Sequence, residues 1–310
     1  MILIRYRGGL GNQMFQYAFQ LAVQQKYTDV SVLADLSHYT LNQEHNGFEL
    51  QKYFGIELQT AKENEIRRFS PYYVPSSFVC KLPSAARNFL TEHYQYRYAE
   101  KEKKKKADHI YLQESHNSYE PQVFELDEKK DWYLDGLWQD LRYLNGCEEK
   151  VKEAFTFHNE ELYTAQDREW KEQIEKSNSV GIHIRRGDFV NSKFDICSEE
   201  YFRKALKILN EQKEKLTLFF FSDDPDFVEE QFADLSNKVL IRHTAENSIL
   251  DMEMLSLCKH KILSNSTFAF WAGWLGRKEG EAVIAPKYSL IKKDKKYRFA
   301  GAADWQYLEP

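Results

Sequence analysis

Apolar and polar positions follow a strand, turn, helix and strand pattern at the start of the chain. Residues 1–6 are mostly apolar and predict a buried strand, and residues 7–13 form a glycine-rich turn. From Met14 to Lys26 the apolar residues recur at helical spacing, and residues 30–35 form a second apolar run that ends on Asp35. This order predicts a βαβ unit and therefore a parallel sheet.

The second half of the chain repeats the alternation of strands and helices over a longer stretch. The elements that it predicts span residues 180–184, 198–212, 216–221, 226–232, 239–242, 249–258, 261–264 and 267–275. Helical stretches at 141–155 and 162–176 bridge the two halves, and no internal repeat is evident. We therefore expect an α/β fold with two domains, one over residues 1–150 and the other over residues 151–310.

Residues from about 60 to 130 follow neither pattern clearly. Residues 61–69 are predicted to be helical, three prolines interrupt the segment 70–83, and residues 131–139 again predict a strand. The run 101–106 consists of Lys and Glu and is typical of a solvated loop or strand end. A patch that attracts an acidic glycan or lipid is the alternative interpretation of this run.

Composition narrows the classes of function. A chain of 310 residues with 42% apolar residues can fill two cores, and a formal net charge of -5 argues against a general nucleic-acid or membrane-surface binder. No apolar run reaches the length of a membrane span, and no secretory signal precedes the first strand. The cysteines, which form no CxxC pair, predict reduced thiols in a cytosolic setting: Cys80, Cys147, Cys197 and Cys258.

The glycine-rich turn partly matches a dinucleotide-binding fingerprint. Gly9 and Gly11 fit the first two glycines of that motif, and Asp35 lies where a ribose-binding acid is expected. Met14 occupies the third glycine position, and Asn12 and Gln13 add two amides that can hydrogen-bond a sugar or a phosphate. We interpret the turn as a ligand-facing loop, and keep an NAD-dependent oxidoreductase or epimerase as an alternative.

The densest charge lies at the end of the strand 180–184. His183 and Arg185 point to one face of this strand, and Arg186, Gly187 and Asp188 follow directly. Ligands bind at the carboxyl ends of strands in open α/β sheets, so the arginines predict an anion site, with phosphate as the anion. The alternative is a structural ion pair in which Asp188 neutralises one arginine.

Three later segments could contribute to the same chemistry. Ser266 and Thr267 open a helix, where N–H groups favour anions, although they could serve only as caps. The acidic run 223–226 resembles a metal motif, but with Pro225 it is better explained as a helix start, so we expect no metal. Asp251 is either a helix-start acid or a carboxylate that accepts N–H groups from a base such as guanine.

These motifs together resemble a known family of enzymes. Residues 183–188, His-Ile-Arg-Arg-Gly-Asp, resemble the HxRRxD signature of inverting α-1,2- and α-1,6-fucosyltransferases and protein O-fucosyltransferases. Residues 8–18 resemble the amino-terminal motif of the α-1,2-fucosyltransferases of glycosyltransferase family 11. Residues 135–139, 251–256 and 264–272 resemble further blocks of that family, whereas the region from about 60 to 130 does not match.

The resemblance implies a GT-B-type fold of two Rossmann-like domains that face a cleft, with the acceptor on the first domain and GDP-fucose on the second. It implies metal-independent, inverting transfer of fucose to the 2-hydroxyl of a terminal β-galactose in glycan biosynthesis. The partners would be GDP-fucose and a β-galactoside glycan, which could be lipid-linked, and no nucleic acid. The location would be cytoplasmic, compatible with peripheral contact at the inner membrane, because the anchor of the animal members is absent.

The resemblance also implies roles for individual residues. Arg185 would hold the diphosphate and stabilise the departing GDP, with Asn12 and Asp188 as further catalytic residues. We expect Asp188 to act indirectly, by pairing with Arg186. The residues expected to contact the donor are Gly9, Gly11, Asn12, Gln13, His183, Arg185, Asp251, Ser266, Thr267 and Phe268. No carboxylate is singled out as the general base; Asp188, Asp35 and Asp135 are candidates. A non-catalytic glycan- or nucleotide-binding protein is a further alternative.

Overall fold

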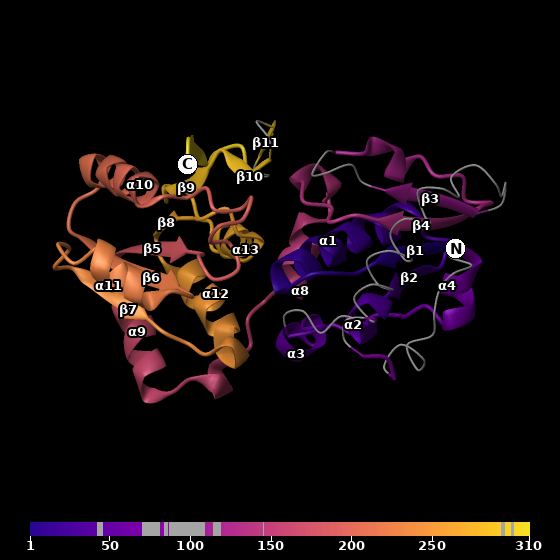
Figure 1. The fold of residues 1–310 in the computed structure, drawn as a ribbon, viewed down its shortest axis with the longest axis horizontal. Helices are drawn as coiled ribbons and strands as arrows, with labels where there is room; N and C mark the ends of the chain where they lie inside the picture. Colours follow the sequence, from indigo (N-terminus) through magenta and orange to yellow (C-terminus); the bar gives the residue numbers. More distant parts are fainter. Residues whose placement is uncertain are drawn as a thin grey trace. The chain divides into compact units, whose positions relative to one another are not determined.

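The computed structural model describes residues 1–41, 46–69, 81–83, 86, 109–113, 119–144, 146–292, 295–298 and 301–310. Contacts divide the chain into two compact units, Met1–Ala154 and Phe155–Pro310 (Figure 1). Each unit is an α/β domain built on a parallel sheet. The charge run 101–106 lies outside the described residues.

The first unit contains a parallel sheet of four strands in the order β2-β1-β4-β3. Every residue of the central strand β1 is buried, as expected for a strand covered on both faces. The strands are β1 Ile2–Arg5, β2 Val32–Asp35, β3 His109–Gln113 and β4 Asp131–Asp135.

Helix α1, Leu10–Lys26, fills the connection between β1 and β2, as the apolar spacing predicts. Its Phe19 stacks on Trp138, with ring centroids 4.1 Å apart. The packing attaches the segment after β4 to the helix that follows the glycine-rich turn. The other helical segments among the described residues of this unit are α2 Ser37–Leu41, α3 Leu50–Phe54, α4 Glu63–Phe69, η2 Pro121–Phe124, η3 Leu141–Tyr143 and α8 Glu148–Ala154.

The second unit contains a parallel sheet of six strands in the order β12-β9-β8-β5-β6-β7. Strand β5 therefore lies in the interior of the sheet, between β6 and β8. The strands are β5 Asn178–Ile184, β6 Leu216–Ser222, β7 Lys238–Ile241, β8 His260–Ile262, β9 Val283–Pro286 and β12 Gln306–Leu308. A separate antiparallel hairpin consists of β10 Tyr288–Lys292 and β11 Lys295–Arg298.

Side chains of β5 alternate between the two faces of this sheet. Ile182 and Ile184 pack in a buried cluster with Tyr201 of α10. His183 lies near Phe268 at the start of α13, with ring centroids 5.8 Å apart. The helical segments are η4 Glu160–Leu162, α9 Ala165–Lys176, α10 Glu199–Gln212, α11 Pro225–Gln231, η5 Ala245–Asn247, α12 Ser248–Leu257 and α13 Thr267–Leu275.

The structure differs from the predicted elements in several places, beginning with α1, which starts at Leu10 where the sequence predicted a turn up to Gln13. The predicted helix 141–155 is a short 3-10 turn and then α8, with Gly146 at φ +80° between them. The predicted strand 131–139 ends at Asp135, because Trp138 adopts φ +55°, which no strand accommodates. Strands β9 to β12 follow the last element that the sequence predicted.

Candidate functional site

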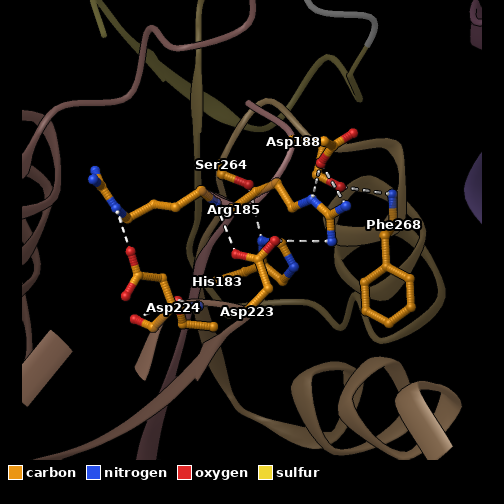
Figure 2. A network of polar contacts seen from close by, with 10 residues as sticks. His183, Arg185, Asp188, Asp223, Asp224, Ser264 and Phe268 are labelled. Atoms are coloured by element: carbon orange, nitrogen blue, oxygen red, sulfur yellow. Dashed lines mark hydrogen bonds and ion pairs between the residues drawn. The ribbon is translucent and has the colours of Figure 1, made fainter. Parts of the chain in front are cut away.

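Arg185 lies at the carboxyl end of β5, where two carboxylates hold its guanidinium. Its Nε and Nη2 donate to Asp188 Oδ1 at 2.9 and 2.6 Å, and its Nη1 lies 3.0 Å from Asp223 Oδ2 (Figure 2). The Arg185 side chain is 33% exposed. A guanidinium has more N–H groups than these contacts use, so donors remain for a phosphate.

Arg186 has a different partner from the one that the sequence predicted. Its Nε donates to Asp224 Oδ2 at 2.9 Å, and its guanidinium lies 3.9 Å from the ring centroid of Phe227. The expected pair of Arg186 with Asp188 is therefore wrong, because Asp188 binds Arg185. The reason is the register of parallel strands: Ile184 of β5 lies beside Ser222 of β6, so both strands end at the same edge.

Gly187 allows Asp223 to approach the end of β5 closely. A Cβ atom at Gly187 would lie 2.6 Å from Asp223 Oδ2, a distance that real Cβ atoms do not show. The same carboxylate accepts the backbone N–H of Arg186 at 2.8 Å. Asp223 therefore joins the two arginine residues, one through its side chain and the other through its backbone.

The acidic run after β6 forms a helix start, as predicted, and Asp224 is its cap. Its side chain accepts the backbone N–H of Phe227 at 3.1 Å, and Pro225 occupies the first turn of α11. No group of three or more His, Cys, Asp or Glu side chains in the described ranges could hold a metal ion. Two arginines here face three carboxylates, so these side chains together carry no net positive charge.

His183 is a neutral hydrogen-bonding group in this site. Its Nδ1 lies 2.9 Å from Oγ of Ser264, two residues after β8. Burial, and then the charge of Arg185, lower the pKa of His183 to about 3, so the imidazole carries no charge at neutral pH. Nε2 has no hydrogen-bond partner within the part of the chain that the structure describes, and it is the ring atom that can meet a ligand.

The residues after β8 begin α13 beside His183. Ser266 is the N-cap, and its side chain accepts the backbone N–H of Phe268 at 3.2 Å. Ser266 therefore serves as a helix cap, which was the alternative interpretation of this segment. Thr267 and Phe268 are half-buried in the first turn of a helix that carries no acidic residue there. The start of α13 therefore offers backbone N–H groups at the carboxyl edge of the sheet.

Asp251 lies in the first turn of α12 and has a partner that the sequence did not suggest. Its Oδ1 lies 2.6 Å from Nδ1 of His243, and Nε2 of the same ring lies 2.9 Å from Asp167 Oδ1. His243 stands alone in a loop and belongs to no motif. Its place just after β7, at the carboxyl edge of the sheet, is the one signal in the sequence that could have identified it.

The glycine-rich turn of the first unit is held by its own amides. Gly8 adopts φ +81°, and Gly9 is the N-cap of α1. Gln13 is fully buried; its amide donates to the carbonyls of Gly8 and Gly47 and accepts the backbone N–H of Glu49. Gln13 thus holds the backbone of Gly8, Gly47 and Glu49 in place. Because its side chain is buried, it would act on a ligand only through the position of that backbone.

Asn12 joins the turn to the segment after β4. Its Oδ1 accepts from Gln139 Nε2 at 2.7 Å, and its side chain lies against Gly8, where a Cβ atom would come within 2.4 Å of Asn12 Nδ2. Asn12 is half-buried, and Gly11 beside it is buried. Of the loop residues proposed from the sequence, Gly9 and Asn12 are the more accessible.

Two candidates for the general base are buried in ion pairs and hydrogen bonds. Asp135 is fully buried and lies 3.3 Å from Arg5 Nη1 and 3.5 Å from Arg7 Nε. Asp35 is 1% exposed and accepts from the hydroxyl of Tyr133 at 2.5 Å. Both carboxylates stabilise the first unit, and neither reaches solvent. Asp188, with a side chain 53% exposed, is the accessible candidate of the three.

Three further predictions from the sequence concern the cysteines, the membrane spans and the dinucleotide fingerprint. Cys147, Cys197 and Cys258 are free thiols in the structure, and Cys80 lies outside the described residues. Across the described residues, no helix combines the length and the apolar character that a membrane crossing requires. In the glycine turn, Met14 is fully buried in the core at the third position of the dinucleotide fingerprint.

Comparison with known proteins places these features in a family. The O-antigen biosynthesis glycosyltransferase WbnK of Escherichia coli is 27% identical over 300 residues, covering 90% of this chain and 92% of that protein. An alpha-1,2-colitosyltransferase of Escherichia coli is 29% identical over 299 residues, covering 92% of this chain and 91% of that protein.

A structure of Arabidopsis thaliana FUT1 in complex with GDP shares the fold. Its TM-score is 0.51 at 14% identity, and the match covers 94% of this chain and 71% of that chain. The expected GT-B-type architecture of two Rossmann-like α/β domains is thereby confirmed. Nothing in these comparisons supports an NAD-dependent oxidoreductase. The model of Glycosyl transferase family 11 matches residues 1–309, and the chain therefore belongs to glycosyltransferase family 11 and is an enzyme of that class.

Proposed function

We propose that the protein is an inverting α-1,2-fucosyltransferase that uses GDP-fucose and a terminal β-galactoside. The observation that carries the proposal is the position of Arg185, a partly exposed guanidinium at the carboxyl end of β5. The start of α13 and the neutral His183 belong to the same edge of the sheet. Such an edge suits a nucleoside diphosphate, since it combines a cation, backbone N–H groups and a hydrogen-bonding ring.

In this proposal the second unit binds the donor. Arg185 holds the diphosphate with its remaining N–H groups, and Ser266, Thr267 and Phe268 meet the phosphates through hydroxyls and backbone N–H groups. His183 contacts the guanosine through Nε2. Asp251 accepts N–H groups from the guanine edge with the oxygen that His243 does not occupy. The structure of a distant relative in complex with GDP is consistent with this class of ligand.

The reaction forms one bond and breaks another at the anomeric carbon of fucose. The 2-hydroxyl oxygen of galactose attacks this carbon from the face opposite GDP, the bond to the β-phosphate oxygen breaks, and the hydroxyl proton passes to a base. Negative charge collects on the departing diphosphate, and preorganised donors that stabilise such charge supply the largest catalytic contribution in many enzymes. Arg185 fits this role because a guanidinium never deprotonates and binds phosphate through two N–H groups.

Metal independence is supported by the pairing of the acidic run. Asp223 and Asp224 are bound to Arg185 and Arg186, and Asp224 also caps α11. Carboxylates that are already paired with guanidinium groups are poor ligands for a cation. The N–H groups of Arg185 that its carboxylate partners leave unused, and the backbone N–H groups at the start of α13, are then the donors that we expect to hold the diphosphate.

The first unit is proposed as the acceptor side. Gly9 is the N-cap of α1 and Gly11, Asn12 and Gln13 lie in its first turn, which the hydrogen bonds of the Asn12 and Gln13 amides hold in place. Asn12 is the member whose side chain is accessible and polar, so it is the one that we expect to contact a sugar. Asp188 is the accessible carboxylate for the proton of the acceptor, although its contacts with Arg185 equally suit a positioning role.

A second donor calls for a direct test, because one of the similar proteins is named a colitosyltransferase. Colitose is 3-deoxy-fucose, so both donors present the same GDP and differ at one hydroxyl of the sugar. Turnover of equal concentrations of GDP-fucose and GDP-colitose with one galactoside decides between them. We propose fucose as the donor sugar. A higher kcat/KM for GDP-colitose than for GDP-fucose would show that colitose is the donor sugar instead.

The acceptor is proposed to be a glycan that ends in β-galactose and is carried on a lipid at the cytoplasmic face of the inner membrane. The O-antigen role in the name of a relative supports a glycan of this kind. Faster turnover of a lipid-linked galactoside in vesicles than of the free glycan would support the membrane contact. Equal rates would argue for a free glycan.

The decisive experiment combines purified protein, GDP-fucose and a β-galactoside in EDTA. We expect release of GDP and a product in which NMR shows an α-1,2 linkage. No GDP release with any of several galactosides would refute the transferase, and another linkage would correct the regiochemistry. Activity that EDTA abolishes and Mn²⁺ restores would refute metal independence.

A further inference from the structure

His243 lies between two carboxylates in the second unit. Its Nδ1 is 2.6 Å from Asp251 Oδ1, its Nε2 is 2.9 Å from Asp167 Oδ1, and its side chain is only 7% exposed. An ionised carboxylate can only accept hydrogen bonds, so both ring nitrogens must donate. The geometry therefore describes an imidazolium that is shared by two aspartates.

Asp167 is the fixed end of this network. Its Oδ2 accepts from the backbone N–H and the hydroxyl of Thr164 at 2.7 and 2.8 Å, and its own backbone N–H donates to Thr164 Oγ1 at 3.3 Å, which completes the capping box of α9. The ring of Trp170, one turn along the same helix, stands edge-on to His243 with centroids 5.9 Å apart. Because both oxygens of Asp167 are engaged, the imidazolium is held in one position from the side of α9.

Asp251 is the open end of the network. Its side chain is 22% exposed, compared with 4% for Asp167, and within the described ranges its Oδ2 has no hydrogen-bond partner. Helix α12 packs on β5 and β6, and its first turn follows the carboxyl end of β7. The open oxygen of Asp251 thus belongs to the same edge of the sheet as His183 and Arg185.

We propose that His243 is a positioning residue for recognition of the nucleobase: anchored by Asp167, it fixes the orientation and the negative charge of Asp251, whose second oxygen accepts the N–H groups of guanine. The inference rests on the proposed use of a guanine nucleotide. It requires no covalent step, and His243 keeps its proton throughout.

The protonation states agree with this geometry. Burial raises the pKa of Asp251, and the hydrogen bond and charge of His243 oppose that rise. Burial by itself would lower the pKa of His243, but the hydrogen bonds and charges of Asp251 and Asp167 outweigh it, so this pKa is raised. The charged groups that act on the ring are Asp167 from α9 and Asp251 from α12. Loss of the imidazolium proton at high pH would leave Asp251 without its cation.

The test measures binding of GDP and of inosine diphosphate to the full chain by titration calorimetry. Inosine lacks the 2-amino group of guanine, so wild-type protein should bind GDP more tightly. In His243→Gln the amide oxygen faces one of the carboxylates and the cation is lost. We expect GDP affinity to fall about tenfold or more, the scale of one hydrogen bond to a charged group, and the preference for GDP over inosine diphosphate to shrink.

His243→Arg should recover part of this preference, because a guanidinium can donate to both carboxylates. His260→Gln is the matched control: His260 is also buried, at the start of β8, and its Nδ1 accepts the backbone N–H of Ala282 at 3.0 Å. We expect this control to change the melting temperature without changing the preference between the two nucleotides.

The outcomes separate the inference from the proposed function. If the wild-type protein binds neither nucleotide, the proposed function fails and this inference fails with it. If it binds GDP and His243→Gln keeps the same affinity and preference, the inference alone is overturned. Should that variant not fold, the wild-type protein decides: GDP affinity should fall as pH rises through the raised pKa of His243, and an affinity that does not fall at alkaline pH overturns the inference.

Discussion

Replacement of Arg185 by alanine is the sharpest test of the proposed chemistry. The change removes the guanidinium that we expect to stabilise the departing diphosphate. Loss of one preorganised donor of this kind lowers kcat by roughly two to three orders of magnitude, which corresponds to about 2.7 to 4 kcal/mol of transition-state stabilisation. The measurement is GDP release under saturating GDP-fucose and galactoside at 25 °C.

The effect on stability should be small enough to be told apart. Arg185 is one-third exposed, and its partners Asp188 and Asp223 are about one-half and one-quarter exposed, so solvent screens both pairs. Exposed ion pairs contribute about 0.2 to 1 kcal/mol, and a loss of about 1 kcal/mol lowers the melting temperature of a unit of this size by roughly 2 to 4 °C. Unfolding therefore cannot account for a hundredfold loss of turnover at 25 °C.

The neighbouring arginine provides a matched control. Arg186 belongs to the same strand end, but it pairs with Asp224 and lies over the ring of Phe227. Arg186→Ala should lower the melting temperature and leave kcat near the wild-type value. Arg185→Lys keeps the charge but loses the two-pronged geometry, so its rate should fall between those of Arg185→Ala and the wild type. Near-normal turnover in Arg185→Ala, or equal losses in both alanine variants, would refute the reasoning.

Three further predictions concern stability. Gly187→Ala should destabilise the protein by about 1 to 3 kcal/mol and lower turnover, because the new Cβ displaces Asp223 from Arg185. Calorimetry measures the stability and GDP release the turnover, and a substitution that changes neither would contradict the close approach of Asp223 to Gly187. Lys261 is fully buried and donates to the carbonyls of Cys258 and Gly276, the residues that end α12 and α13. Lys261→Met should therefore lower the free energy of unfolding by about 1 to 3 kcal/mol, measured by urea denaturation. An unchanged midpoint would argue against these contacts. Because the pKa of His243 is raised in the folded state, its stabilising contribution is complete below its pKa in the unfolded chain and disappears as pH rises through its pKa in the folded state. His243→Gln should therefore lose more stability at acidic and neutral pH than at alkaline pH. Equal losses in unfolding experiments across this range would contradict the imidazolium.

The pattern along the chain was enough to predict the architecture. Apolar spacing depends on residues a few positions apart, and it indicated the βαβ opening and the alternation in the second half. The two faces of β5 also followed from alternation, with Ile182 and Ile184 in the core and His183 on the other face. The motifs at residues 8–18 and 183–188 were sufficient to suggest the family.

The local pattern of apolar and polar residues could not determine where a strand or helix ends when a residue nearby has a positive φ. The predicted strand beyond Asp135 failed at Trp138, whose left-handed conformation leaves no trace in hydropathy. The sequence did not predict β9 and β12, which pair with each other in a sheet whose order only the folded chain defines.

Partners of the charged groups were decided by the tertiary structure. The sequence paired Arg186 with Asp188 because they are neighbours in the chain, yet Asp223 and Asp224 arrive from the adjacent strand and divide the arginines between them. Likewise His243 meets Asp167 across 76 positions, and no motif marks either residue. The sequence by itself determined which segments form strands and helices, since those depend on near neighbours. Only the folded sheet decided which charges meet, because the strand ends that it brings to one edge are separated by dozens of residues along the chain.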